Sequence, residues 1–160
     1  MKDCRPIWRG WAKTLSKFFY GGLAHVRIGG IERPMLIDRF GEVKQPMMDY
    51  PFFVVGGFVV EEDTLGQHTG LFDYLETPVY EGDYIQVDYP EGEPKWYLVK
   101  WDDRKKQFYL EEKRHGIKQG KKLTVKSALD GRDWLVVGND VETAADPWEE
   151  YWINKTEERE

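Results

Sequence analysis

Four carboxylates lie close together in residues 69–87, TGLFDYLETPVYEGDYIQV, and carboxylate oxygens are ligands that calcium prefers. They are Asp73, Glu76, Glu81 and Asp83. Their spacing does not match the calcium loop of an EF-hand, and no glycine stands at that loop's central position. Asp and Gly also favour turns, because Asp bonds the backbone that follows it and Gly adopts positive φ. We therefore expect a structural role for this segment and no metal site.

Other residues that could do chemistry are few and scattered. Three histidines fall in three different predicted elements, so they form no zinc-binding pair: His25, His68 and His115. Cys4 is the only cysteine, which excludes an intramolecular disulfide and a cysteine zinc cluster. Neither Ser16 nor Ser127 lies in a nucleophile-elbow pattern, and the glycines of GGLAHVRIGG lack the lysine of a P-loop. We expect a non-enzymatic protein without a cofactor.

Charge is unevenly distributed along the chain, whose formal net charge is −6. Residues 113–127, here called the basic island, hold six basic and no acidic residues: Lys113, Arg114, Lys118, Lys121, Lys122 and Lys126. These cations could neutralise phosphates, with Phe108 or Tyr109 available for stacking. A solvated hairpin loop has the same composition, and the acidic segments on both sides oppose a polyanion. Nucleic-acid binding is therefore the alternative hypothesis, and a solvated loop is the favoured interpretation.

Short strands separated by polar turns must position these groups. The pattern predicts strands at 23–28, 34–40, 52–63, 83–89, 95–102, 107–112, 122–127 and 134–139. Short strands at even spacing are typical of a small barrel or sandwich. Entry into a strand through Gly-Asp, as at residues 82–83, recurs in small SH3-like barrels. We predict a mainly β chain with an N-terminal β extension (1–64) and an SH3-like barrel with a short C-terminal helix (65–160), packed as one unit.

Local signals refine this prediction at three places. Residues 80–83 predict a tight turn, with Asp83 bonding a nearby backbone N–H and Gly82 supplying positive φ. Asp146-Pro147 predicts the start of a helix whose stripe of Trp148, Tyr151 and Trp152 covers the barrel. Residues 11–19 are a second helix candidate.

The chain's seven tryptophans leave two interpretations open. They are Trp8, Trp11, Trp96, Trp101, Trp134, Trp148 and Trp152. Either some of them lie at an interface, where tryptophan is enriched, or all belong to the core and its lid. The predicted strands at 23–28 and 52–63 also expose pairing groups that a homo-oligomer would cover. The longest apolar run, residues 52–60, is too short to cross a membrane.

The central segment resembles the YopX family of phage and prophage proteins. That family's pattern is Gln-x-Thr-Gly-Leu-x-Asp, a short turn, and Ile-Tyr-Glu-Gly-Asp leading into a strand. Here it matches Gln67, Thr69, Gly70, Leu71 and Asp73, then Val79, Tyr80, Glu81, Gly82 and Asp83. Two outer pieces extend the similarity, namely Trp8-Arg9-Gly10-Trp11 and Val137-Gly138-Asn139. We call the matched residues with Gly138 and Asn139 the family motif.

The resemblance implies a small β-barrel encoded by a phage or an integrated element, and it implies no activity. Residues 75–78, Leu-Glu-Thr-Pro, replace the family's usual Asn-Gly turn, and the basic island has no family counterpart. We therefore expect an interaction module in the cytoplasm of a bacterial host, binding itself or a host protein.

Overall fold

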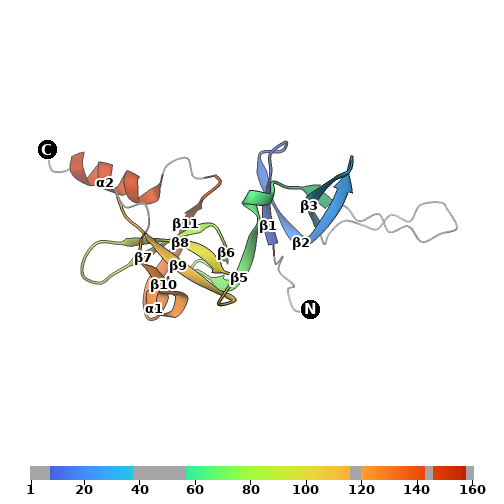
Figure 1. The fold of residues 1–160 in the computed structure, drawn as a ribbon. Helices are drawn as coiled ribbons and strands as arrows, with labels where there is room; N and C mark the ends of the chain where they lie inside the picture. The colour runs from blue at the N-terminus through green and yellow to red at the C-terminus, as the bar shows by residue number, and fades with distance from the viewer. Residues whose placement is uncertain (1–7, 38–56, 116–119, 143–145, 158–160) are drawn as a thin grey trace. The chain divides into compact units, whose positions relative to one another are not determined.

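The computed structural model describes residues 8–37, 57–115, 120–142 and 146–157 (Figure 1). The chain divides into two compact units, residues 1–68 and 69–160. Strand β5 (Gly66–Phe72) belongs to both, because the boundary falls between His68 and Thr69. The prediction that 1–64 and 65–160 pack as one unit stays a prediction.

The first unit is an antiparallel sheet in which the hydrogen-bonded order is β4-β3-β2-β1-β5. Its other elements are β1 (Trp8–Ala12), β2 (Lys17–Ile28), β3 (Ile31–Ile37), β4 (Gly57–Val59) and the 3-10 turn η1 (Glu62–Thr64). A two-residue turn joins β2 to β3. Gly29 and Gly30 have φ of 59° and 82°, and two positive φ values are what a two-residue hairpin with a type I′ turn needs.

A small apolar cluster holds this unit together. Ala12, Leu36 and Val60 are buried, and partly buried side chains pack around them: Trp8, Phe19, Leu23 and Leu65. The ring of Phe19 also stacks on that of Phe58, with centroids 3.7 Å apart. The strand predicted at 52–63 is described only from Gly57, and residues 38–40 of the strand predicted at 34–40 also lie outside the described residues.

The helix candidate at residues 11–19 is wrong. The chain reverses there, with Ala12 paired to Lys17 across a turn in which Leu15 N–H donates to the Ala12 carbonyl at 3.1 Å. Ser16 takes a positive φ of 48° in this turn. Trp11 and Phe18 then meet edge to face across the strand pair, with ring centroids 5.1 Å apart. Cross-strand aromatic packing thus outweighs local helix propensity.

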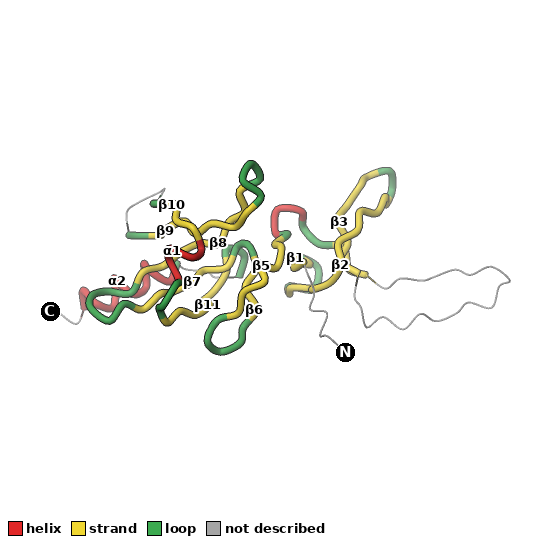
Figure 2. The backbone as a smooth tube through the Cα atoms, turned by 90° about the horizontal axis from the view of Figure 1, so that it is seen from below, coloured by secondary structure: helices red, strands yellow, loops and turns green. Residues whose placement is uncertain are grey.

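The second unit carries a five-stranded antiparallel sheet in the order β10-β9-β8-β7-β11 (Figure 2). Its strands are β7 (Asp83–Asp88), β8 (Lys95–Asp102), β9 (Gln107–Lys113), β10 (Lys122–Thr124) and β11 (Asp133–Asn139). The short strand β6 (Pro78–Tyr80) pairs with β5 outside this sheet. Helix α1 (Val125–Leu129) lies beside β9 and β10, and α2 (Pro147–Glu157) follows β11.

Both faces of this sheet carry buried side chains. One face packs in the main cluster of Val79, Ile85, Val87, Tyr97, Val99, Leu110, Ala128 and Leu129. The other face has a smaller cluster of Tyr84, Trp96, Leu98 and Trp148, with Tyr151 packed against it. Trp148 meets Tyr84 edge to face at 5.2 Å. Helix α2 therefore covers the second face, and it begins at Pro147 as the sequence predicts.

The mainly β fold class and the C-terminal helix are confirmed. The two sheets are open, and the described residues form no closed barrel, so the SH3-like barrel is not confirmed. The strand predicted at 122–127 is wrong in its second half. Thr124 caps a helix there, because its hydroxyl accepts the Ser127 N–H at 3.2 Å. None of the helices in the described ranges is long and apolar enough to cross a membrane.

Candidate functional site

The first half of the family motif holds strands β5 and β6 together. The Thr69 hydroxyl donates to the Val79 carbonyl at 3.0 Å and accepts the Leu71 N–H at 3.1 Å. Gly70 takes a positive φ of 84°, and Leu71 packs against the main cluster. Gln67 lies in the first unit, where it pairs with Trp8 of β1.

Asp73 organises the loop between β5 and β6. One carboxylate oxygen accepts the N–H groups of Leu75 (2.9 Å) and Thr77 (2.8 Å), and the other accepts that of Val136 in β11 (3.0 Å). Burial alone would raise the pKa of this carboxyl group, but the bonds from Val136, Thr77 and Leu75 hold its pKa below the ordinary value. The carboxylate is thus committed to backbone donors.

The second half of the motif builds the turn that enters β7. Asp83, 1% exposed, accepts the Tyr80 N–H at 2.8 Å, as predicted for this turn. Gly82 has φ of 88°, donates to the Val99 carbonyl at 2.9 Å and accepts the Asp140 N–H at 2.9 Å. The turn is therefore tied to β8 and to the residue after β11.

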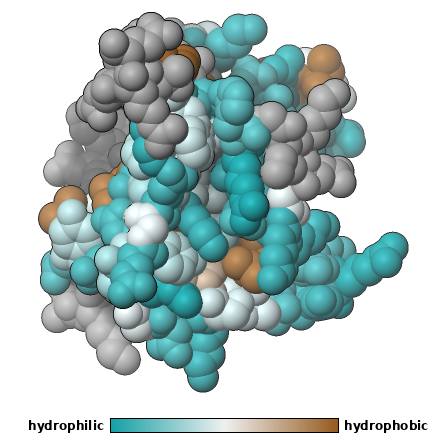
Figure 3. Space-filling model, turned by 90° about the vertical axis from the view of Figure 1, so that its left-hand side faces the viewer, coloured by the Kyte–Doolittle hydropathy of each residue, from teal (hydrophilic) through white to brown (hydrophobic). Residues whose placement is uncertain are grey.

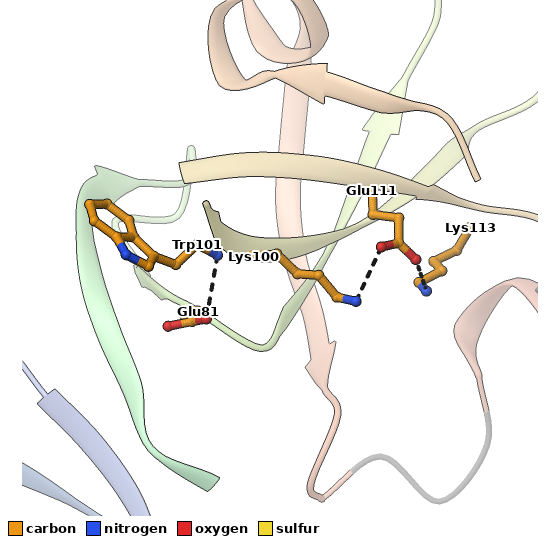
Figure 4. Close-up of polar contacts among 5 residues, drawn as sticks. All are labelled: Glu81, Lys100, Trp101, Glu111 and Lys113. Atoms are coloured by element: carbon orange, nitrogen blue, oxygen red, sulfur yellow. Dashed lines mark hydrogen bonds and ion pairs between the residues drawn. The ribbon is translucent and has the colours of Figure 1, made fainter. Parts of the chain in front are cut away.

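Glu81 and Asn139 tie further backbone to the same turn. Glu81 accepts the Trp101 N–H at 3.3 Å (Figure 4). Asn139 pairs with Asp83 in the β11–β7 ladder, and its side-chain oxygen accepts the N–H groups of Val141 (3.0 Å) and Glu142 (2.7 Å). Gly138 follows a register shift in β11, at which Val137 is the extra residue.

The four carboxylates singled out in the sequence are therefore not gathered in one place. Asp73, Glu81 and Asp83 each accept a different set of backbone donors, and Glu76 lies exposed at a positive φ of 62°. Within the described part of the chain, no group of three or more His, Cys, Asp or Glu side chains is placed to hold a metal. What these motif residues do in the structure is to hold backbone segments together.

The basic island is dispersed over several elements. Lys113 ends β9, Lys122 begins β10 and Lys126 lies on α1, while Lys121 is exposed just before β10. Lys122 lies over the Tyr109 ring at 5.1 Å, and Lys118 is outside the described residues. The two cations at the start of the island have acidic partners. Lys113 contacts Glu111 at 2.6 Å, and Arg114 contacts Glu112 at 2.7 Å.

A groove of about 520 Å³ lies where β8 begins and β9 ends. We call it the α2 groove, and its lining residues are Glu93, Pro94, Lys95, Trp96, Glu112, Lys113, Arg114, His115 and Trp152. Trp96 and Lys113 form the last register pair of the β8–β9 ladder, so the groove opens where the two strands stop pairing. Its volume is in the range of sites that take a small molecule or a peptide side chain.

Helix α2 forms one wall of this groove and is held by polar contacts at two places. His115 Nδ1 contacts a carboxylate oxygen of Glu149, which joins the end of β9 to the helix. Lys155 contacts Glu93, which joins the helix to the loop before β8. Between these contacts Tyr151 packs on Trp96, with ring centroids 5.0 Å apart, and on Trp152 at 5.8 Å.

Two buried carboxylates lie beneath the cations of this region. Glu111 bridges Lys100 (3.1 Å) and Lys113 (2.6 Å), as Figure 4 shows. Burial raises the pKa of Glu111, but the two lysines outweigh burial and bring its pKa below the ordinary value. Glu112 accepts both Nε (2.9 Å) and Nη2 (2.7 Å) of Arg114 on one oxygen.

Sequence reasoning missed this groove. It predicted the stripe of Trp148, Tyr151 and Trp152 as a lid, and the first two of these side chains do cover the sheet. Trp152 instead lines the groove. One signal in the sequence could have indicated it. Trp148 and Tyr151 are enough to cover the sheet, so the adjacent Trp152 was available for another role. Of the seven tryptophans, Trp96 and Trp148 are buried and none of the other five is fully exposed.

Comparison with known proteins adds one finding. The family model described as YopX protein matches residues 8–144. The chain belongs to the YopX family. The match includes every residue of the family motif and most of the groove, and it ends before α2. A search of curated proteins found no match for this chain.

Proposed function

We propose that this YopX-family chain is a non-enzymatic interaction module of a phage or prophage, working in the cytoplasm of a bacterial host. Its binding site is the α2 groove, and its partner is a segment of a host protein. The observation that supports this most directly is the groove itself, in which Trp96 and Trp152 form apolar walls beside a rim of ion pairs. Protein interfaces combine an aromatic centre with a polar rim in this way.

The rest of the second unit supports a binding role over a catalytic one. The motif carboxylates Asp73, Glu81 and Asp83 accept backbone N–H groups, and a carboxylate so engaged is poorly placed to act as an acid, a base or a ligand. In the coloured part of Figure 3, the molecular face on the side of α2 is mainly hydrophilic, and hydrophobic residues lie at separate places. A local groove is therefore a better candidate site than a broad apolar face.

The SH3-like barrel remains part of this proposal. Strands β7 to β10 follow one another as neighbours, the single helical turn α1 comes next, and β11 returns to pair with β7. This order supports the proposal of an SH3-like barrel that is open along one side. The second unit would then be a small β scaffold with α2 added beside it.

Site-specific crosslinking tests the proposed function. A photoreactive residue in place of Trp152 should capture a defined host protein in cells, because its side chain lines the groove. The matched control is the same residue in place of Tyr20, which is 43% exposed in the first unit. Capture of the same protein from both positions, or of none from position 152, would count against the proposal.

Self-association is the second candidate, because β4, in the predicted strand 52–63, lies at the edge of its sheet. The predicted strand 23–28 is not an edge, since β2 lies between β1 and β3. Light scattering tests it. A species at twice the monomer mass of 18.9 kDa would support a homodimer, and a strict monomer at high concentration would exclude one. Nucleic-acid binding through the basic island is less well supported, because its described cations are dispersed over β9, β10 and α1.

A further inference from the structure

We propose that the α2 groove selects an acidic segment of its protein partner, with one apolar side chain between carboxylates. This inference rests on the proposed function and names the chemistry of the partner. Three features support it: the exposure of the cations, the balance of charge, and the apolar walls.

Exposure is the first feature, because the cations and carboxylates of this region lie at different depths. Among the lining side chains, Glu112 is 7% exposed, Lys113 is 15% exposed and Arg114 is 57% exposed. A partner approaching from solvent therefore meets Arg114 first. Arg114 uses Nε and Nη2 for Glu112, and within the described part of the chain its Nη1 has no partner. A planar guanidinium with donors to spare suits a carboxylate.

Charge balance decides between an acidic peptide and a nucleic acid. Of the side chains that line the groove, Lys95, Lys113 and Arg114 are cations and Glu93 and Glu112 are carboxylates, so the lining keeps one net positive charge. One net charge matches one or two carboxylates of a peptide. Tight binding of a nucleic acid needs many uncompensated cations, because its affinity comes from neutralising successive phosphates.

Apolar walls complete the site. Trp152 and Trp96 both line the groove, and Trp96 is 4% exposed. The aromatic contacts of Trp148 with Tyr84 and of Tyr151 with Trp96 hold α2 in place beside the strands. A groove formed in advance loses little conformational entropy when an apolar side chain enters it.

The test is a set of NMR titrations of the full-length ¹⁵N-labelled protein with synthetic probes. The probes are a short peptide with one Leu between Asp and Glu residues, its charge-reversed Lys version, an acidic version with Ser for Leu, and an oligothymidine. We expect only the first peptide to shift the indole N–H signals of Trp152 and Trp96 and the Nε–H signal of Arg114. Its affinity should fall with added salt.

Variants locate the effect. Arg114→Gln should weaken the acidic peptide by about 3- to 10-fold, which is what losing one partly exposed charged contact costs. Arg114→Lys should restore most of this loss, and Arg27→Gln in the first unit should have no effect. Because Arg114→Gln leaves Glu112 without its partner, the probe series on the wild-type protein decides the proposal whether or not this variant folds.

Each other outcome overturns the inference. If the Lys peptide bound equally well, the charge of the groove would not determine which peptide binds. If the Ser peptide bound equally well, the apolar walls would not contribute to the choice of peptide. Preference for oligothymidine would assign the site to nucleic acid. If no probe shifts these signals while crosslinking from position 152 still captures a host protein, the acidic preference fails and the proposed function stands.

Discussion

The two units use different means to hold their turns. In the first unit, the β2–β3 turn depends on the backbone freedom of Gly29 and Gly30, and the residues beside it, Ile28 and Ile31, are more than half exposed. In the second unit, buried side chains hold the turns, with Asp73 and Asp83 accepting backbone N–H groups. The comparison shows that a few buried polar side chains fix the turns of the second unit. The first unit depends instead on backbone pairing and a small apolar core.

The largest effect is expected at Asp73. Asp73→Ala removes the acceptor of three N–H groups, those of Leu75, Thr77 and Val136. Hydrogen bonds to a charged group contribute about 1.5–3 kcal/mol each, so the free energy of unfolding should fall by at least about 3 kcal/mol. Urea denaturation measures it, with Asp73→Asn, which keeps one oxygen acceptor, as the milder control. If the free energy of unfolding fell by less than about 1 kcal/mol, the turns of the second unit would not depend on the Asp73 side chain, and the difference between the two units would disappear.

Leu36 in the small core is the corresponding position of the first unit. It is 1% exposed, and Leu36→Ala should cost about 2–4 kcal/mol through lost burial and the cavity left behind. Hydrogen exchange should show lower protection of β1, β2 and β3. Equal loss of protection in β7 and β8 would show that the units unfold together, as the prediction of one packed unit requires.

Substitutions of Gly82 and Gly92 can distinguish the cost of a positive φ from the cost of crowding around an added side chain. A Cβ there would lie 2.6 Å from Asp140 Oδ1 and would need a φ of 88°, so Gly82→Val should cost about 1–3 kcal/mol. Gly92 is the control, because its φ is also positive, 116°, but a Cβ added there would meet nothing within 4 Å. Thermal melting should place Gly82→Val below Gly92→Val, and equal melting temperatures would show that only φ matters.

Acid should destabilise the second unit through the same carboxylate. The pKa of Asp73 is lower in the folded chain than its ordinary value of 3.8. Its contribution to stability is therefore fully present well above pH 3.8 and is lost as the pH falls through the lower folded pKa. Urea midpoints measured from pH 5 downward should fall less steeply for Asp73→Asn than for the wild type. Parallel curves would assign the acid sensitivity to other carboxylates, Glu111 among them.

The smallest effect is expected in the basic island. Replacing Lys118, Lys121 and Lys122 with Ala should change the free energy of unfolding by no more than about 0.5 kcal/mol, as for most surface substitutions. The wild type should not bind an oligonucleotide at physiological salt. Tight, salt-sensitive binding that the triple variant loses would instead favour the nucleic-acid hypothesis.

Much of the fold followed from local patterns. The apolar pattern of residues 95–102 and the helix start at Asp146-Pro147 predicted their elements correctly, because each signal lies within the segment that it shapes. The helix candidate at 11–19 failed because a contact between two strands, Trp11 with Phe18, decided the structure there. The helical turn after Thr124 was missed because a single capping hydroxyl ended the strand.

The candidate site was harder to predict than the fold. Trp96, Arg114 and Trp152 come from three elements, and no spacing along the chain indicates that they line one groove. The basic island was defined from the sequence by its net charge alone. In the structure, Lys113 pairs with Glu111 and Arg114 pairs with Glu112. The contact of Glu111 with Lys100 crosses from β9 to β8, so only the pairing of these two strands shows it.

The two oxygens of the Asp73 carboxylate bond different segments of the chain, and this affects the order in which the segments can fold. One oxygen bonds Leu75 and Thr77, which leave the ribosome just after Asp73, and the other bonds Val136, made more than sixty residues later. Short loops close within about 10–100 ns, so the local pair can form long before β11 exists. The loop would then present an already oriented acceptor to the last strand. Asp73 thus lowers the entropy lost when that distant strand arrives.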